Sequence, residues 1–252
     1  MHPVAIREVA LELLSIGLTR RDVCRILDVG YNSTYRWEQR LEPRHRTDHI
    51  RCFRCLDEPP PDDEAYLYLL GQYLGDGHIR KNGTSHALGI SCCTDYPEIL
   101  AEVDWALRTT LAAAVCYRSR PAVGCVTVES TSLHWPCLFP QHGRGRKHER
   151  PIVLEPWQRE MVETDPRPLV RGLIHSDGCR LTNWTERRVG GTVKRYEYPR
   201  YFFANVSDDI RGIFTDALDL LGIARKQNRW NSISVARREA VAALDEFVGP
   251  KS

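Results

Sequence analysis

The sequence predicts an α+β protein in which one fold unit occurs twice behind a small all-α domain. A pattern of Gly, four residues and Asp-Gly occurs at residues 71–77 and again at 172–178. The glycines and the aspartates of the two copies are separated by the same number of positions, so the copies are in register. A repeat this long indicates a duplicated fold unit rather than a stack of small repeats. The same order of helices and hairpins follows each copy, which predicts two antiparallel sheets flanking a central pair of helices.

Composition limits the classes of protein to which the chain can belong. Its 252 residues, 42% apolar and 27% charged, suffice for one medium domain and one small domain. No run approaches the roughly 20 apolar residues of a membrane helix, and the amino terminus lacks a signal-peptide core. Nine cysteines without framework spacing indicate a reducing compartment. We therefore expect an intracellular, cytoplasmic protein of bacterial type, associated with the nucleoid and without a membrane partner.

The amino-terminal domain, residues 1–45, should contain three short helices. Apolar residues recur at helical spacing over 6–14, Thr19 can cap a helix over 20–27, and a polar third helix spans 31–40. Asp28 stands in the turn, where such turns often carry Gly. The segment 18–40 resembles the helix-turn-helix modules of transposases, resolvases and bacterial regulators. In that resemblance Trp37 belongs to the core, and the DNA-facing residues are Tyr31, Asn32, Ser33, Tyr35 and Arg36; a protein-contact domain is the alternative.

Residues 46–64 are predicted to form a linker, because a proline-rich acidic stretch cannot continue a helix. Cys52 and Cys55 in this stretch have the CxxC spacing of a zinc knuckle. Structural zinc needs four ligands, and no second CxxC exists. Two more ligands could come from His134, Cys137, His142 and His148, and two reduced cysteines in a linker are the alternative.

The duplicated domain spans residues 65–252, with repeat one at 65–140 and repeat two at 165–252. Each motif begins as an apolar helix, and small residues one turn apart let the two helices approach closely: Gly71 with Gly75, and Gly172 with Ser176. Gly77 and Gly178 suit the left-handed position that ends a helix. Asp76 and Asp177 lie at the negative end of the helix dipole, where an acid is unfavourable as a cap. Another role is expected for them.

The elements behind the motifs follow one order. In copy one a hairpin at 78–93 precedes a helix at 96–111 and a hairpin at 115–131. In copy two the hairpin at 179–206 is longer, and a helix at 209–221, a hairpin at 224–237 and a last helix to 247 follow. Thr94-Asp95 and Ser207-Asp208 match as helix N-caps, and alternating apolar and polar residues mark the strands.

The two motifs and the repeated element order resemble the LAGLIDADG homing endonucleases in their single-chain form, over about residues 65–248. In that family the motif helices meet between the halves, their terminal acids bind divalent metal, and the sheets form a saddle over DNA. The resemblance implies that Asp76 and Asp177 bind Mg²⁺ or Mn²⁺, that the partner is double-stranded DNA, and that the chain is a monomer with internal pseudo-two-fold symmetry.

Two neighbouring carboxylates repel each other, a conflict that a hard divalent cation relieves while it activates water at a phosphodiester. The resemblance also implies polar or basic residues around the metals on the second and fourth strands, which by motif position are Asn205 on the second strand and Arg237 at the end of the fourth strand of copy two. Copy one offers Ser91 or Cys92 and Ser130 at these places, without a basic residue. Nicking, slow cleavage and cleavage of both strands are therefore alternatives.

Clustered basic residues predict the phosphate contacts. The long hairpin, which also carries Trp184, and the segment between the repeats contribute Arg144, Arg146, Lys147, Arg180, Asn183, Arg187, Arg188, Lys194 and Arg195. The function expected is that of a site-specific DNA endonuclease. The alternatives are a sequence-specific transcription regulator that does not cut DNA and a zinc-stabilised protein-interaction module.

Overall fold

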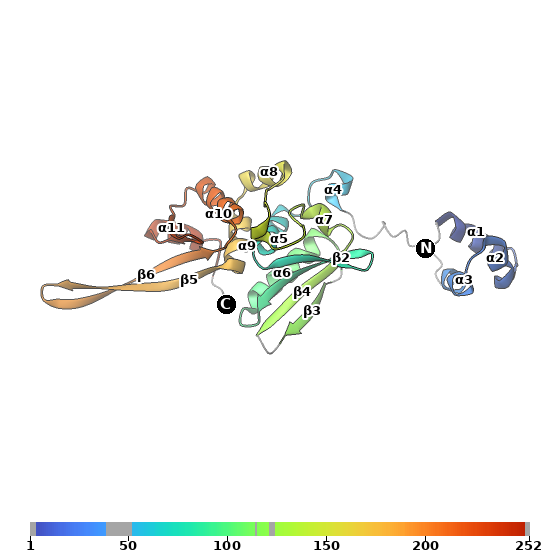
Figure 1. The fold of residues 1–252 in the computed structure, drawn as a ribbon, viewed down its shortest axis with the longest axis horizontal. Coiled ribbons are helices and arrows are strands. Elements are labelled where there is room, and N and C mark those ends of the chain that lie inside the picture. Colours follow the sequence, from blue (N-terminus) through green and yellow to red (C-terminus); the bar gives the residue numbers. More distant parts are fainter. Residues whose placement is uncertain (1–3, 39–51, 114, 121–123, 250–252) are drawn as a thin grey trace. The chain divides into compact units, whose positions relative to one another are not determined.

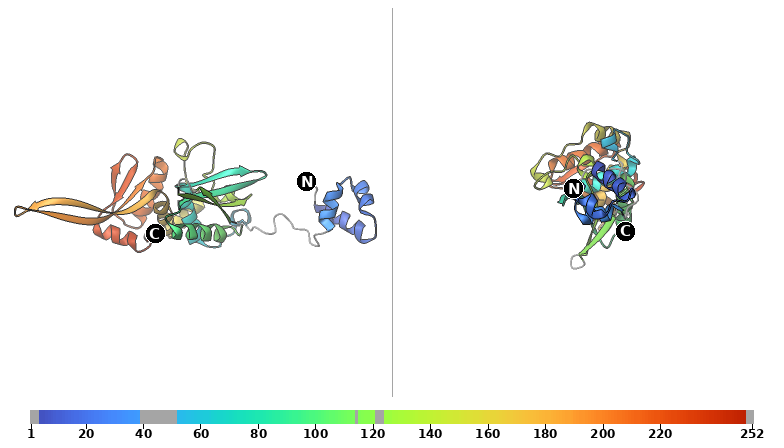
Figure 2. Two further views of the ribbon diagram at one scale, coloured as in Figure 1. Left: turned by 90° about the horizontal axis from the view of Figure 1, so that it is seen from below. Right: turned by 90° about the vertical axis from the view of Figure 1, so that its right-hand side faces the viewer.

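The computed structural model describes residues 4–38, 52–113, 115–120 and 124–249. The chain forms two compact units, residues 1–51 and 52–252. The first contains α1 (Val4–Ser15), α2 (Arg20–Leu27) and α3 (Tyr31–Glu38), which are the three expected helices and which pack into a bundle of their own (Figure 2).

Local capping explains the turn between α2 and α3. The Thr19 hydroxyl accepts a hydrogen bond from the Asp22 N–H at 3.3 Å and so caps the start of α2. Asp28 ends α2 with φ of 50° and ψ of 48°, the left-handed conformation for which glycine is otherwise favoured. Aspartate tolerates this region better than most residues, so the turn forms without the glycine that is common there.

The second unit begins at Cys52, inside the expected linker. The short helix α4 (Phe53–Leu56) is anchored by Phe53, which is buried and whose ring lies 5.6 Å from that of Tyr66 and 5.9 Å from that of Trp157. The latter half of the 46–64 segment is therefore part of the second unit, because an aromatic anchor outweighs the spacer character of the prolines. Residues 46–51 lie outside the described part of the chain.

Two four-stranded antiparallel sheets repeat one topology, in the order β1-β2-β4-β3 and β5-β6-β8-β7 (Figure 1). The strands are β1 (Gly77–Asn82), β2 (Ser85–Cys93), β3 (Val115–Arg120), β4 (Cys125–Ser132), β5 (Gly178–Val189), β6 (Thr192–Ala204), β7 (Lys226–Arg229) and β8 (Ser232–Val235). The expected duplicated α+β fold is confirmed by this shared order. β5 and β6 run on beyond the other strands as a two-stranded ribbon (Figure 1).

Helices cover one face of each sheet. The helices that follow α4 in this unit are α5 (Asp63–Leu74), α6 (Pro97–Thr110), α7 (Trp135–Leu138), η2 (Lys147–Glu149), α8 (Pro156–Thr164), α9 (Arg167–Asp177), α10 (Asp208–Leu220) and α11 (Arg238–Asp245). α6 packs on β2, β3 and β4, whereas α10 and α11 pack on β8 and β6. None of the helices in the described ranges has the length and apolar composition needed to cross a bilayer.

The motif helices α5 and α9 pack against each other through glycine, as expected (Figure 1). A Cβ on Gly71 would lie 2.6 Å from the Leu169 carbonyl oxygen and 2.7 Å from the Leu173 nitrogen. A Cβ on Gly172 would overlap the Tyr68 carbonyl oxygen. Only hydrogen fits at these two positions, so the backbones touch where the two halves meet.

The expectation of a left-handed conformation at Gly77 and Gly178 is wrong. Gly77 begins β1 without a positive φ, and Gly178 is extended, with φ of −109° and ψ of 169°. Glycine is required there for space, because a Cβ on Gly178 would lie 2.7 Å from the Ile174 Cα. Each strand turns back against the helix it follows, and this turn sets the motif aspartate at the junction.

Candidate metal centre and nucleic-acid interface

The two motif aspartates end the two central helices on the same side. Asp177 is the last residue of α9, and Asp76 follows α5 directly before β1. The Asp177 Oδ2 atom lies 3.2 Å from the position that a Cβ on Gly75 would occupy. The carboxylate of the second repeat therefore lies against the residue that precedes the acid of the first repeat.

Lys147, from the segment between the repeats, lies at the same junction. Its ammonium donates to the carbonyl oxygens of Leu74 at 2.9 Å and Gly75 at 2.7 Å, and also to that of Tyr73. These are carbonyls at the negative end of α5, which a cation stabilises. Burial lowers the pKa of Lys147 to about 8, while the charges of Asp177 and Asp76 oppose that shift. Lys147 is thus a half-buried cation close to both acids.

Lys147 should make metal affinity depend on pH. Its pKa of about 8 lies below the usual 10.5, so raising the pH through about 8 neutralises the ammonium in the folded protein. The repulsion between Lys147 and a divalent cation then disappears, and we expect Mn²⁺ to bind about tenfold more tightly at pH 9 than at pH 7. Calorimetric titration of the DNA-free protein measures this change.

The matched variants for that experiment are Lys147→Met and Arg146→Met. The first should bind Mn²⁺ with an affinity that does not change between pH 7 and 9, and the second should keep the pH dependence. A Lys147→Met protein that is folded by circular dichroism and still shows the full pH dependence would contradict the assignment of the effect to Lys147.

Asn205 lies beside Asp177, as the sequence predicts. Its Nδ2 donates to Asp177 Oδ2 at 2.6 Å, and its Oδ1 accepts the Ser207 N–H at 2.8 Å. The Asn205 backbone N–H also donates to the Asn231 carbonyl oxygen at 3.0 Å. Backbone and side-chain bonds together hold the Asn205 amide against the carboxylate.

The register of the sheets identifies the counterpart of Asn205 in the first repeat. Gly178 pairs with Phe203, and Gly77 pairs with Ile90, so Asn205 corresponds to Cys92 rather than to Ser91. Cys92 lines a small pocket with Asp76, and burial together with the Asp76 charge raises the pKa of its thiol to about 12. The two aspartates therefore have unlike neighbours, an amide in one half and a neutral thiol in the other.

Arg237 does not reach this centre. It caps α11 and is exposed, and it follows Val235, which pairs with Tyr201. The other end of β8, at Ser232, pairs with Ala204 beside Asn205. At about 3.3 Å per residue, Arg237 lies roughly 15 Å further along the strand. The assignment of Arg237 from the sequence failed because β8 begins near Asp177 and its chain direction leads away from that residue. Ser130 of the first repeat, which pairs with Leu88, lies away from Asp76 for the same reason.

Strand alternation divides the basic residues of the β5–β6 ribbon between two faces. Paired residues share a face, so Arg187 pairs with Lys194 and lies on the same face as Asn183. Arg180 lies on the opposite face, where it holds Asp245 of α11 through bonds of 2.7 and 2.8 Å. Arg188 and Arg195 share the face of Arg180, and Arg195 stacks on Trp184 at 4.8 Å and pairs with Glu197 at 2.8 Å. Half of the expected DNA contacts of this hairpin, Arg180, Arg188 and Arg195, therefore lie on one face of the ribbon. α11 covers this same face where the ribbon joins the sheet.

The helix-free face of each sheet carries further arginines. On the second sheet Arg200 donates to Ser234 Oγ at 2.6 Å. On the first sheet Arg80 and Arg118 flank Glu129, with nitrogen–oxygen distances of 2.8 and 2.9 Å. The sequence analysis missed Arg80, Arg118 and Glu129. Each of them is separated by an even number of positions from other polar residues of its own strand, β1, β3 or β4. This alternation is the signal that would have placed them on one face.

The other candidate residues belong to the segment between the repeats and to α3. Arg144 and Arg146 are exposed, and Arg146 lies 4.0 Å from Glu149. In α3, Tyr31 and Tyr35 are about half exposed, Asn32 is exposed and Ser33 is half-buried. Arg20 stacks on both tyrosines at 5.3 and 5.1 Å. The Arg36 side chain lies outside the described part of the structure, and Trp37 is half-buried while Thr34 is fully buried.

The CxxC pair lies in a four-residue cluster. Cys52, Cys55, His134 and Cys137 bring their ligand atoms to within 4.8 Å of one another. His142 and His148, the other two candidates, are not members of this cluster. His142 instead lies near His86, with ring centroids 6.0 Å apart.

Comparison with solved structures gives distant likenesses. They include the LAGLIDADG meganuclease I-AabMI bound to uncleaved DNA (12% identity, 72% of this chain and 82% of that chain, TM-score 0.48). Another is the homing endonuclease I-WcaI bound to its DNA recognition sequence (11%, 84% and 90%, 0.46). A third is the N-terminal LAGLIDADG domain of DUF199/WhiA (11%, 75% and 83%, 0.42). No protein-family model matches the chain, and no curated protein matches it.

Three features of this chain define its fold. Two motif helices pack through Gly71 and Gly172, each motif carries an aspartate before its last glycine, and each is followed by a sheet with the same strand order. The described part of residues 52–252 therefore forms a duplicated α+β domain with the two motif helices at its centre.

Proposed function

We propose that the protein is a DNA endonuclease that hydrolyses phosphodiester bonds with a divalent cation, Mg²⁺ or Mn²⁺, held by Asp76 and Asp177. One observation carries the proposal: an aspartate from each repeat ends a central helix at the same junction, with the Asp177 carboxylate 3.2 Å from the Cβ position of Gly75. Carboxylate oxygens are the donors that such cations prefer, and the Asn205 amide donates a hydrogen bond to the Asp177 carboxylate at 2.6 Å.

The bound cation would neutralise the scissile phosphate and lower the pKa of an attacking water. The protein supplies the positions of the two acids through the glycine contacts of α5 and α9. The helix-free faces of the two sheets would bind the duplex, because Arg80, Arg118, Arg187, Lys194 and Arg200 lie on them. A single chain provides both repeats, so we expect the active form to be a monomer.

The unlike neighbours of the two aspartates support unequal cleavage of the two DNA strands. Asn205 fixes the Asp177 carboxylate through a 2.6 Å bond, whereas Cys92 offers only a thiol near Asp76. Groups that neighbour a metal-binding acid tune how tightly it binds the ion. We therefore expect nicked DNA to accumulate before linear DNA.

A non-cleaving, sequence-specific transcription regulator is the second candidate. The observation that favours it is the separate three-helix unit, whose α3 exposes Asn32 and half of Tyr31 and Tyr35 to solvent. An exposed polar helix in such a unit suits the major groove. In either function the partner is double-stranded DNA.

A randomised supercoiled-plasmid library tests the two candidates. The full chain is incubated with the library in Mg²⁺ or in EDTA, and bound and nicked plasmids are sequenced. The nuclease proposal expects nicks at an enriched site with Mg²⁺ and none with EDTA. Enrichment of bound sites without any metal-dependent break would favour the regulator instead.

The two faces of the ribbon make a matched pair of variants for DNA binding. Arg187→Ala removes a charge from the helix-free face and should weaken binding several-fold, with a shallower dependence on salt. Arg188→Ala removes the neighbouring charge from the opposite face and should bind as the parent does. Fluorescence anisotropy across a salt series measures both. Equal losses in the two variants would contradict the assignment of the faces.

A further inference from the structure

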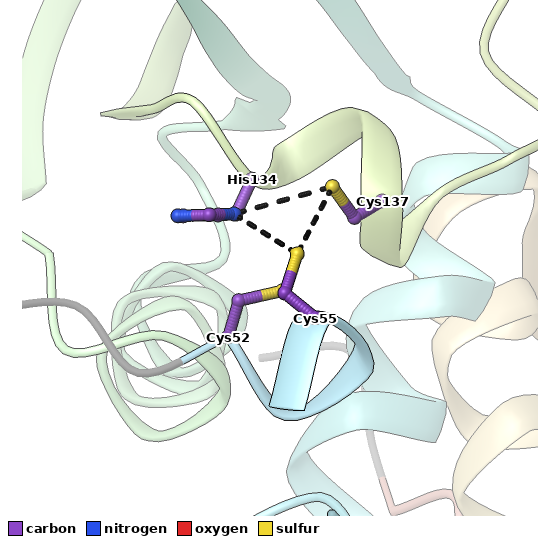
Figure 3. A group of neighbouring side chains, drawn as sticks. All are labelled: Cys52, Cys55, His134 and Cys137. Carbon is purple, nitrogen blue, oxygen red and sulfur yellow. Dashed lines mark hydrogen bonds between the residues drawn. The ribbon is translucent and has the colours of Figure 1, made fainter. Parts of the chain in front are cut away.

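Four metal-ligand side chains come together on two short helices that lie far apart in the sequence (Figure 3). Cys52 and Cys55 belong to the start of α4, and His134 and Cys137 to α7. Each pair spans one helical turn, because the Cys55 N–H donates to the Cys52 carbonyl at 3.0 Å and the Cys137 N–H to the His134 carbonyl at 2.9 Å. Both pairs have two residues between the ligands, so the two turns present their side chains to the same point.

The distances among these atoms fit a tetrahedral ion. Bonds of about 2.3 Å to sulfur and about 2.0 Å to nitrogen place two sulfurs about 3.8 Å apart and a sulfur and a nitrogen about 3.5 Å apart. The Cys55 and Cys137 sulfurs are 3.7 Å apart, and His134 Nδ1 is 3.4 Å from the first and 4.0 Å from the second. The 3.7 Å separation is also far longer than a disulfide bond of about 2.05 Å. These spacings are the edges of one coordination sphere.

We propose that Cys52, Cys55, His134 and Cys137 bind one structural Zn²⁺. Three thiolates and an imidazole are soft and borderline donors, which select zinc over the hard cation expected at Asp76 and Asp177. Four protein ligands fill the tetrahedron and leave no position for water, so the site has no catalytic role. The metal is held through His134 Nδ1, the nitrogen that faces the two sulfurs (Figure 3).

The zinc ties the first helix of the second unit to α7, near the end of the first repeat. α4 has four residues, too few to be stable alone. Its apolar anchor is Phe53 against Tyr66 and Trp157, and Arg54 stacks on Trp157 at 4.6 Å. Zinc adds a second attachment at Cys52 and Cys55, and it closes a loop of about 80 residues. Metal binding therefore fixes the point at which the second unit begins.

Zinc content of the full chain tests this site. Protein purified without chelator should hold about one zinc per chain by mass spectrometry of the element, and Cys55→Ser or Cys137→Ser should hold less than a tenth of that. The matched controls are Cys179→Ser, an exposed cysteine elsewhere, and His148→Asn, a rejected ligand candidate; both should keep one zinc. Parent protein that holds no zinc after refolding with Zn²⁺, or variants that keep it, would overturn the proposal.

Cobalt provides a measurement that does not depend on the variants folding. The metal-free parent titrated with Co²⁺ should develop thiolate-to-cobalt absorption and the visible bands of tetrahedral cobalt, saturating at one equivalent and lost on adding Zn²⁺. An octahedral spectrum would overturn the proposal. The Asp76→Asn, Asp177→Asn double variant should give the tetrahedral spectrum unchanged, which separates this site from the one proposed for cleavage.

Discussion

Asp76→Asn and Asp177→Asn should each lower metal-dependent DNA cleavage by about 10³-fold or more. Each change removes a negative charge and one carboxylate oxygen from the junction of α5 and α9 while keeping the side-chain shape. Both variants should bind DNA as tightly as the parent, because the acids do not attract phosphate. Cleavage assays on the enriched plasmid site, with anisotropy for binding, measure the two effects separately.

Asp95→Asn is the control for these variants, because Asp95 is an aspartate outside the junction that follows β2 in the first repeat. It should cleave and bind as the parent does. If Asp76→Asn and Asp177→Asn also leave cleavage unchanged, the metal is not held by the motif acids and the nuclease proposal fails. If neither they nor the parent cut any site but all bind DNA, the regulator is the better description.

Gly172→Ala should destabilise the second unit by about 3 kcal/mol or more. The new methyl group would overlap the Tyr68 carbonyl oxygen and approach the Gln72 nitrogen to 3.1 Å. Helix backbones cannot yield as a flexible side chain does, so α5 and α9 must separate along their contact. The gain in helix propensity, about 1 kcal/mol, is too small to offset this cost. We expect the melting temperature to fall by roughly 10 °C.

Gly212→Ala is the same chemical change as Gly172→Ala, but it should raise the stability of the protein rather than lower it. Gly212 also lies within a helix, α10, but a Cβ there meets nothing within 4 Å. That variant should be more stable than the parent by about 0.5–1 kcal/mol, because alanine favours the helix. Thermal unfolding followed by circular dichroism compares the two variants, and equal stability of both would show that the α5–α9 contact is looser than the structure indicates.

Local rules explain why the elements could be predicted. Alternating residues in β4 and β8, the N-caps at Thr19 and Ser207, and the small residues at Gly71 and Gly172 each depend on neighbours in the chain or on a repeated spacing. The repeat supported the predicted order of elements, because each hairpin of one copy could be compared with its counterpart in the other. The position of Asn205 beside Asp177 was predicted in this way, from its distance to a motif.

Positions that depend on long-range register could not be predicted. Arg237 was misplaced because a residue at the end of a strand reaches the site only if that end points toward it. Phe53 was assigned to a linker because its partners, Tyr66 and Trp157, lie in other elements. The same limit left four candidates for two zinc ligands, and only the packing of α4 on α7 selected His134 and Cys137.

The sequence by itself determined the duplication, the closeness of the two motif helices and the pair of acids that ends them. These features follow from spacing and residue size, which are local properties. The tertiary structure alone decided that Lys147 lies half-buried beside those acids, that Cys92 is the counterpart of Asn205, and which arginines share a face. Each of these depends on which strand pairs with which and in what register, and contacts between segments far apart in the chain set that register.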